Sequence, residues 1–189
     1  EWNFDETILH SKGGPIHPLS NPKDSQFFSR ASELGLKNAQ LCAFGMTRRR
    51  GTEARLDPGM KALLQASTPV VTIVGKTSSF HVETVLGVSL DENLNMIRDT
   101  VEYLTSESKE VFYDAEHFFD GWKLNSTYSL ETLRAAVAGG ATRLVLCDTN
   151  GGTLPTEVAS IVAEVTQSIE TPLKSHYRKK SSQNSGYLC

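Results

Sequence analysis

Short apolar runs alternate with amphipathic stretches along the middle of this chain. Successive runs begin about 30 to 40 residues apart, which is the length of a strand followed by a helix. Antiparallel strands need only a short turn between them, whereas parallel strands need a long crossover connection. The spacing therefore predicts successive strand–helix units and a parallel sheet. The apolar runs cover residues 41–44, 70–74, 111–113, 144–147 and 172–173.

The stretches between the runs carry signals for helix starts. Asp57 precedes Pro58, so the pair offers a capping side chain and a proline suited to a first helical turn. Ser89 and Glu92 have the spacing of a capping box, in which each side chain bonds the other residue's backbone N–H. We therefore expect helices after residues 21, 57, 89 and 154, with apolar stripes at 27, 28, 31 and 34, at 90, 94, 97, 101 and 104, and at 158, 161, 162, 165 and 169.

Two parallel architectures fit this pattern, an open doubly wound sheet and a barrel. A doubly wound sheet that binds a dinucleotide has a G-x-G-x-x-G turn after its first strand, and this chain has no such motif. A complete eight-fold barrel takes roughly 250 residues, more than the 189 of this chain. If the fold is a barrel, the chain holds about five of the eight units.

Composition is that of an ordinary globular protein, with 39% hydrophobic and 22% charged residues. The chain has no apolar run of about 18 residues, and no basic stripe crosses its body at a net charge of -3. We therefore expect neither a membrane nor a nucleic-acid partner. Three widely spaced cysteines argue against a disulfide framework and a zinc knuckle. We expect a reducing compartment, the cytoplasm, with an organelle as the alternative.

The two ends differ from the middle. Residues 1–19 lack apolar periodicity, and residues 174–189 contain four basic residues and no acidic one. We expect a divergent N-terminal segment over 1–19, a partial catalytic barrel over 20–173, and a polar, basic, disordered tail over 174–189. The chain begins with Glu1 rather than Met, so its targeting is left open.

Polar clusters follow the apolar runs, where the catalytic face of a parallel barrel lies. Arg48 and two further arginines follow the first run. They suit a carboxylate or a phosphate, although a solvated basic loop is the simpler interpretation. His81 follows the second run and can be a ligand, a base or a surface cap. Neither cluster decides a function by itself.

Two later clusters are more specific. Residues 114–120 combine three carboxylates and a histidine with adjacent phenylalanines. Carboxyl groups beside apolar bulk can have the shifted pKa values that general acid–base catalysis uses. Asp148 and Thr149 lie on a tight turn that suits hydrogen bonds with a small polar substrate, although a turn that only caps the next helix needs similar residues. Cys147 ends an apolar run and is interpreted as a core residue.

Five segments of the chain resemble citramalate synthases of the 2-isopropylmalate and homocitrate synthase family. The two most specific segments are YDAEHFFDG at 113–121 and LCDTNGGTLP at 146–155, and the similarity spans residues 20 to 173. The resemblance implies a (β/α)8 barrel, present here in part. It implies an acyltransferase that condenses acetyl-CoA with pyruvate to give citramalate and CoA, a step toward isoleucine. A divalent cation, Mg or Mn, and a homodimer are implied for the intact enzyme.

The resemblance also implies roles for residues of this chain. Glu116 matches the family's glutamate near the reacting groups, and His81 matches a histidine of the substrate pocket. Thr149 matches the threonine that hydrogen-bonds the carboxylate of the keto acid. Arg48 and Asp148 are weaker candidates for substrate binding.

The family's metal site is incomplete in this chain. The first-strand DxTLRDG motif has no counterpart, and in the HxHND motif only His176 is kept, because Arg178 stands at the position of the second histidine. A single imidazole beside added positive charge is a poor site for a divalent cation. We therefore expect the chain on its own to be inactive. The alternatives are a non-catalytic remnant of such an enzyme and a related metal-dependent aldol lyase.

Overall fold

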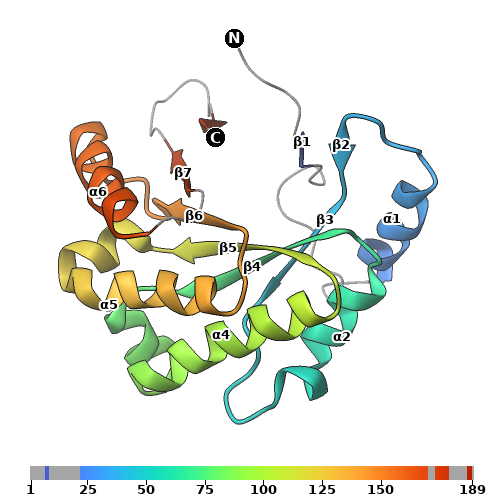
Figure 1. Cartoon of the computed structure of the whole chain (residues 1–189), viewed down its shortest axis with the longest axis horizontal. Helices are drawn as coiled ribbons and strands as arrows, with labels where there is room; N and C mark the ends of the chain where they lie inside the picture. Colours follow the sequence, from blue (N-terminus) through green and yellow to red (C-terminus); the bar gives the residue numbers. More distant parts are fainter. Residues whose placement is uncertain (1–6, 9–21, 170–172, 179–186, 189) are drawn as a thin grey trace.

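Parallel strands lie side by side in chain order at the centre of the molecule (Figure 1). In this computed structural model the described residues are 7–8, 22–169, 173–178 and 187–188, with side chains described from 27 to 169. The parallel strands are β3 (Cys42–Met46), β4 (Val70–Lys76), β5 (Glu110–Glu116), β6 (Arg143–Cys147) and β7 (Leu173–Arg178). β8 (Tyr187–Leu188) pairs antiparallel with β7, and β1 (Thr7–Ile8) pairs with β2 (Ala39–Gln40).

The strands predicted from the apolar runs are confirmed, and β4 and β5 continue further than predicted. Their apolar runs end at Val74 and Tyr113, whereas the strands end at Lys76 and Glu116. Lys76 and Glu116 are partners in the parallel register, because the ladder from Val70↔Glu110 runs on to the last residue of both strands. The longer strands therefore carry charged residues on a rigid part of the sheet instead of on loops.

The helices are α1 (Pro22–Ser32), α2 (Pro58–Gln65), α4 (Leu90–Ser106), α5 (Phe118–Ala138) and α6 (Pro155–Ser168), with the short α3 (Ser79–His81) and η1 (Ala54–Leu56). α3 continues into a π-helical turn, η2 (Val82–Leu86). Among the described residues, no helix has the length and apolar character needed to cross a membrane.

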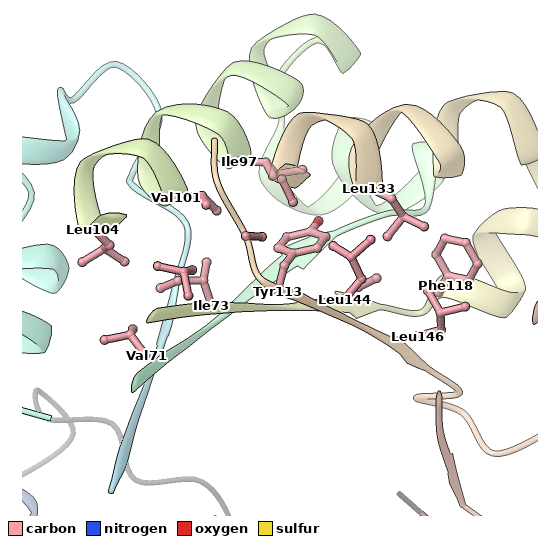
Figure 2. Packing of buried hydrophobic residues seen from close by; sticks show 14 of the residues in the cluster. Val71, Ile73, Ile97, Val101, Leu104, Tyr113, Phe118, Leu133, Leu144 and Leu146 are labelled. Carbon is pink, nitrogen blue, oxygen red and sulfur yellow. The ribbon is translucent and has the colours of Figure 1, made fainter. Parts of the chain in front are cut away.

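One face of the sheet packs against the helices. Tyr113, Leu144 and Leu146 point from the strands into the layer between sheet and helices, where they meet Ile97 and Leu133 (Figure 2). α1 and α6 join the same cluster through Phe28, Ile161 and Val165. A doubly wound sheet has helices on both faces and a reversal of strand order. Strands in unbroken chain order with one shared helix layer therefore define part of a β/α barrel.

The opposite face of the sheet has much less apolar packing. The described residues form one small buried apolar cluster there, Cys42, Val70 and Phe112, and the buried Thr72 contacts it through Cys42. Side chains alternate between the two faces of a strand. The face away from the helices, here named the lumen face, therefore also carries Val74, Lys76, Asp114, Glu116, Val145 and Cys147.

The predicted helix starts are largely confirmed. Asp57 caps α2 by accepting a hydrogen bond from the backbone N–H of Gly59 at 2.7 Å. Ser89 caps α4 by accepting a hydrogen bond from the backbone N–H of Glu92 at 3.2 Å. The second half of the predicted capping box does not form, because the Glu92 carboxylate binds Arg48 instead. The apolar stripe of α1 also ends earlier than predicted, since Leu34 is 68% exposed and lies beyond the helix.

The expected end segments fall largely outside the described residues. Residues 1–6, 9–21, 170–172, 179–186 and 189 are not described, so the expectation of a disordered tail is addressed only at residues 173–178 and 187–188. There β7 continues through Arg178, five residues past the expected boundary at residue 173. Its register with β6 pairs Val145 with Lys174 and Cys147 with His176.

Candidate functional site

Polar residues from the ends of β4 and β5, from α3 and from the loop after β6 meet at the carboxyl ends of the strands. We name this group the strand-end site, and it consists of Lys76, His81, Glu116, His117 and Thr149. The carboxyl ends of parallel strands are the usual location of ligand sites in β/α folds. The structure therefore brings together Glu116, His81 and Thr149, which the family resemblance had singled out.

Glu116 makes two contacts with the end of β4. The ammonium group of Lys76 contacts Glu116 Oε2, and the two side chains are 18% and 26% exposed. The hydroxyl of Thr77 donates a hydrogen bond to the backbone carbonyl of Glu116 at 2.6 Å. Because both contacts come from the end of β4, Glu116 is fixed by the neighbouring strand and not by its own loop.

His117 links the end of β5 to the loop after β6. Its backbone is in the left-handed region, with φ of 55°, which non-glycine residues rarely adopt. In this conformation its N–H donates a hydrogen bond to the Thr149 hydroxyl at 2.8 Å. A second link joins the same two segments, because the Asn150 side chain donates to the carboxylate of Asp120 at 2.6 Å.

The rings of His81 and His117 pack edge to face, with 4.4 Å between their centroids. The Nδ1 atom of each ring is buried and has no hydrogen-bond partner within the described residues. Burial lowers the pKa of His81, and the nearby His117 and Lys76 lower it further. The neutral imidazole of His81 is therefore favoured over the charged form.

Buried polar side chains support the site from the helix layer. Asn93 on α4 is fully buried and donates one hydrogen bond to the carbonyl of Lys76 at 2.9 Å and another to the Tyr128 hydroxyl at 2.8 Å. Ser129 on α5, also fully buried, donates to the carbonyl of Thr77 at 3.1 Å. Strand-end carbonyls need such partners because an unpaired buried carbonyl is costly.

The last residue of the YDAEHFFDG segment, Gly121, lies where a larger residue would not fit. A Cβ at this residue would lie 2.9 Å from the carbonyl oxygen of Thr77 and 3.0 Å from Cα of Ser78. α5 therefore approaches the loop that leads to His81 more closely than any side chain permits. The glycine is needed for packing behind the site.

Asp114 lies on the lumen face two residues before Glu116. Its direct neighbours in the register are Val74 on β4 and Val145 on β6. Burial raises the pKa of Asp114 from 3.8 to about 7. The sequence analysis expected shifted carboxyl groups in this segment, and Asp114 is where burial produces one.

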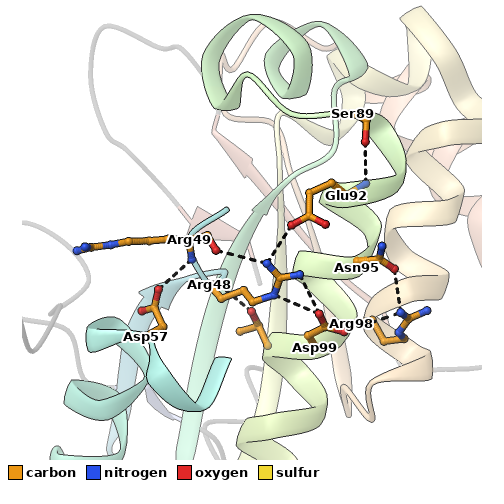
Figure 3. Close-up of polar contacts among 9 residues, drawn as sticks. Arg48, Arg49, Asp57, Ser89, Glu92, Asn95, Arg98 and Asp99 are labelled. Carbon is orange, nitrogen blue, oxygen red and sulfur yellow. Dashed lines mark hydrogen bonds and ion pairs between the residues drawn. The ribbon is translucent and has the colours of Figure 1, made fainter. Parts of the chain in front are cut away.

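Arg48 lies apart from the strand-end site, in an ion-pair network with α4 (Figure 3). Its guanidinium contacts Glu92 at 3.0 Å and Asp99 at 2.8 Å, and its backbone N–H donates to Thr100 at 2.8 Å. Only 8% of the Arg48 side chain is exposed. This placement does not support the expected contact with a substrate, because the donors already serve carboxylates within the chain.

Asp148 is likewise engaged within its own turn. Its two carboxylate oxygens accept hydrogen bonds from the hydroxyl of Thr153 at 2.9 Å and from the Thr153 backbone N–H at 3.2 Å. The residue is 3% exposed. The turn interpretation left open by the sequence therefore accounts for Asp148, whereas the exposed Thr149 next to it takes part in the site.

Metal ligands do not come together in the described part of the chain, where no group of three His, Cys, Asp or Glu side chains is placed to hold an ion. His176 lies in β7 beside Cys147 in the register, and its side chain is outside the described residues. Burial raises the pKa of the Cys147 thiol strongly, and Asp114 and Glu116 add to the effect. Cys147 is thus a poor nucleophile and a poor thiolate ligand.

Sequence reasoning did not single out Lys76, Asn93 or Ser129. Lys76 follows an apolar run, so its position beside Glu116 depends on the length and register of two strands. Asn93 and Ser129 lie inside helices, and only their spacing relative to the apolar stripes marks them as inward-facing. A polar residue at a core position of a helix is the signal that would have identified both.

Comparison with known proteins agrees with a partial β/α barrel that has polar residues at its strand ends. The chain belongs to the HMGL-like family, which it matches over residues 18–183. Among solved structures, the HMG-CoA lyase of Bacillus subtilis has a TM-score of 0.64 at 12% sequence identity, covering 81% of this chain and 50% of that protein. The hydroxymethylglutaryl-CoA lyase of Pseudomonas aeruginosa also has a TM-score of 0.64, at 15% identity. At these identities the likeness shows the fold alone.

Curated relatives in sequence include several (R)-citramalate synthases. That of Aquifex aeolicus is 53% identical over 161 residues, which are 85% of this chain and 30% of that protein. That of Geobacter sulfurreducens is 49% identical over 179 residues, covering 94% of this chain and 34% of the relative. The archaeal protein of Sulfolobus acidocaldarius is 42% identical over 87% of this chain. The chain thus spans about a third of the length of the curated relatives it matches.

Proposed function

We propose that this chain forms part of the barrel of a citramalate synthase-type enzyme, which condenses acetyl-CoA with pyruvate and releases citramalate and CoA. The observation that carries the proposal is the convergence of Glu116, Lys76 and Thr149 at the ends of neighbouring strands. Identity of 42% to 53% to the (R)-citramalate synthases of Sulfolobus acidocaldarius and Aquifex aeolicus supports this reaction over aldol cleavage.

Glu116 is the proposed base. It accepts a proton from the acetyl methyl group, and the resulting enolate carbon forms a bond to the carbonyl carbon of pyruvate. The carbonyl oxygen takes up a proton, and water then cleaves the thioester to release CoA. His81 lies beside His117 at the same strand ends and is proposed to line the substrate pocket.

Thr149 is proposed to bind the carboxylate of pyruvate. Its oxygen already accepts the N–H of His117, so its hydroxyl proton is available for an anionic acceptor. A hydrogen bond to a charged acceptor is stronger than one between neutral groups. The same hydroxyl therefore both fixes the loop and offers a donor to the substrate.

A divalent cation that polarises the keto group belongs to the proposed reaction. The described residues do not fit a complete site for such an ion, since they contain no three-ligand group. The roles proposed for Glu116, His81 and Thr149 accordingly do not include a metal-bound step.

The test is a chimera in which this chain replaces the matching 161-residue stretch of the Aquifex aeolicus protein. We expect the chimera to release CoA from acetyl-CoA and pyruvate, and the Glu116→Gln variant to release none. Glu102→Gln on the exposed side of α4 is the matched control and should keep the activity. The 189-residue chain alone is expected to release no CoA. A folded chimera without CoA release would contradict the proposal, and cleavage of a hydroxyacyl-CoA by it would favour the lyase.

A further inference from the structure

We propose that Lys76 is a positioning residue for Glu116, which holds one carboxylate oxygen so that the other is left to take a proton. This inference rests on the proposed function only in naming Glu116 as the base. The contact itself joins Lys76 Nζ to Glu116 Oε2, and the described part of the chain provides no hydrogen-bond donor to Oε1. A general base needs an oxygen that is not already occupied by a donor.

The register of the sheet places Lys76 directly beside Glu116. Lys76 and Glu116 are the last residues of β4 and β5, and they are direct partners in the parallel ladder. Both lie on the lumen face, because they are two residues beyond Val74 and Asp114, which form the preceding pair on that face. A slip of one residue would place the two charges on opposite faces.

The backbone of each partner is anchored separately. The carbonyl of Lys76 accepts a hydrogen bond from the buried Asn93, and the carbonyl of Glu116 accepts one from Thr77. Asn93 in turn bonds the Tyr128 hydroxyl. Because the two Cα positions are fixed, the ion pair loses less entropy on forming than a pair on flexible segments does.

A second Lys–Glu pair in the chain lacks these features and provides a matched control. Lys123 on α5 contacts Glu157 on α6 at 3.1 Å, with side chains 42% and 41% exposed. Exposed pairs of this kind contribute little to stability or geometry. The Lys76 pair is less exposed and is the one next to the proposed substrate position.

The first measurement tests the contact in the wild-type 189-residue chain with a carbodiimide. The reagent activates a carboxylate, and a contacting amine then displaces it to form an amide bond with net loss of water. We expect mass spectrometry of tryptic peptides to identify an amide between Lys76 and Glu116, which the Glu116→Gln variant loses. The Lys123→Met variant should keep it. Absence of this crosslink in the wild-type chain, while Lys123–Glu157 does crosslink, would overturn the proposal.

The second measurement tests positioning by the ¹³C resonance of the Glu116 carboxyl in a chain labelled at glutamate. Lys76→Met should shift and broaden this resonance, because Oε2 loses its donor and the side chain gains rotamers. Lys76→Arg should restore it, since a guanidinium can donate to the same oxygen. Lys123→Met should leave it unchanged. An unaltered Glu116 resonance in a folded Lys76→Met chain contradicts the positioning role.

Addition of pyruvate separates this inference from the proposed function. Binding is followed by the amide resonance of Thr149, which does not depend on the Lys76 contact. If Lys76→Met alters Glu116 while pyruvate leaves Thr149 unchanged, the positioning role stands and pyruvate binding by this chain is contradicted. If pyruvate shifts Thr149 while Lys76→Met leaves Glu116 unchanged, only the positioning role fails.

Discussion

The backbone N–H of His117 donates a hydrogen bond to the hydroxyl of Thr149 at 2.8 Å and thereby ties the end of β5 to the loop after β6. His117 makes this bond with its backbone in the left-handed region, so the bond supports a conformation that non-glycine residues rarely adopt. Two segments that are separate in the sequence, YDAEHFFDG and LCDTNGGTLP, are joined at this point.

Replacement of Thr149 by valine should lower the free energy of unfolding by about 1 kcal/mol, because the His117 N–H loses its acceptor. Thr149→Ser keeps the hydroxyl and should lose less. Thr156→Val, at an exposed position of α6 without such a bond, is the control. Urea denaturation of the three variants measures the effect. Equal stability of the valine and serine variants would show that the hydrogen bond contributes nothing.

Replacement of Gly121 by alanine should destabilise the chain by about 1–3 kcal/mol, because the new methyl group overlaps the Thr77 carbonyl. The better helix propensity of alanine offsets only part of this cost. Gly152→Ala is the matched control, since a Cβ there meets no atom within 4 Å. Thermal unfolding of both variants decides the matter. A Gly121→Ala chain as stable as wild type would show that α5 can move away from the loop.

Asp114 should make the chain less stable as the pH rises. Its pKa is about 7 in the folded chain against 3.8 normally, so the folded state binds the proton more tightly than the unfolded state does. This stabilisation is complete below pH 3.8 and is lost as the pH rises to about 7. A pKa shift of this size corresponds to about 4 kcal/mol. The actual loss of stability is smaller, because the carboxyl is partly exposed and water screens its charge.

The Asp114→Asn variant removes this titration. Its free energy of unfolding, measured in urea between about pH 4 and pH 8, should therefore fall less with pH than that of wild type. Glu102→Gln, on an exposed turn of α4, serves as the control and should follow the wild-type curve. Parallel curves for wild type and Asp114→Asn would be evidence against a raised pKa at this position.

Replacement of Arg48 by methionine should cost about 1–3 kcal/mol, because Glu92 loses its cation and Asp99 keeps only the longer contact with Arg98 at 3.8 Å. Arg48→Lys should recover only part, since an ammonium cannot reproduce the guanidinium fork. Arg55→Met is the control. It breaks an ion pair whose side chains are 68% and 62% exposed, and no measurable change is expected. Calorimetric unfolding would contradict the prediction if both methionine variants behaved alike.

Much of the fold was predictable from the sequence because its signals are local. Apolar runs at β-α spacing identified the parallel strands, and Asp57 and Ser89 marked helix starts where they now cap α2 and α4. Leu34 was placed wrongly on a helix face, because α1 stops at Ser32 before that stripe is complete. The continuation of β4 and β5 through Lys76 and Glu116 was not predictable from hydropathy, since both final residues are charged.

The site was predictable only in part. Glu116, His81 and Thr149 were identified through family resemblance, and the structure places them together. Arg48 has the residue type that binds an anionic substrate, but its partners Glu92 and Asp99 lie more than forty residues away in the sequence. A sequence pattern identifies a charged group and does not identify the charge that neutralises it. Only the fold distinguishes a donor already in use from one left for a ligand.

The unequal packing of the two sheet faces affects which substitutions the chain can accumulate during evolution. The large buried cluster lies on the helix side, and the lumen face contributes little to it. Substitutions at Val74 or Val145 therefore leave in place the main contacts that hold this chain together. Heritable variation can accumulate on one side of the sheet without loss of the scaffold on the other.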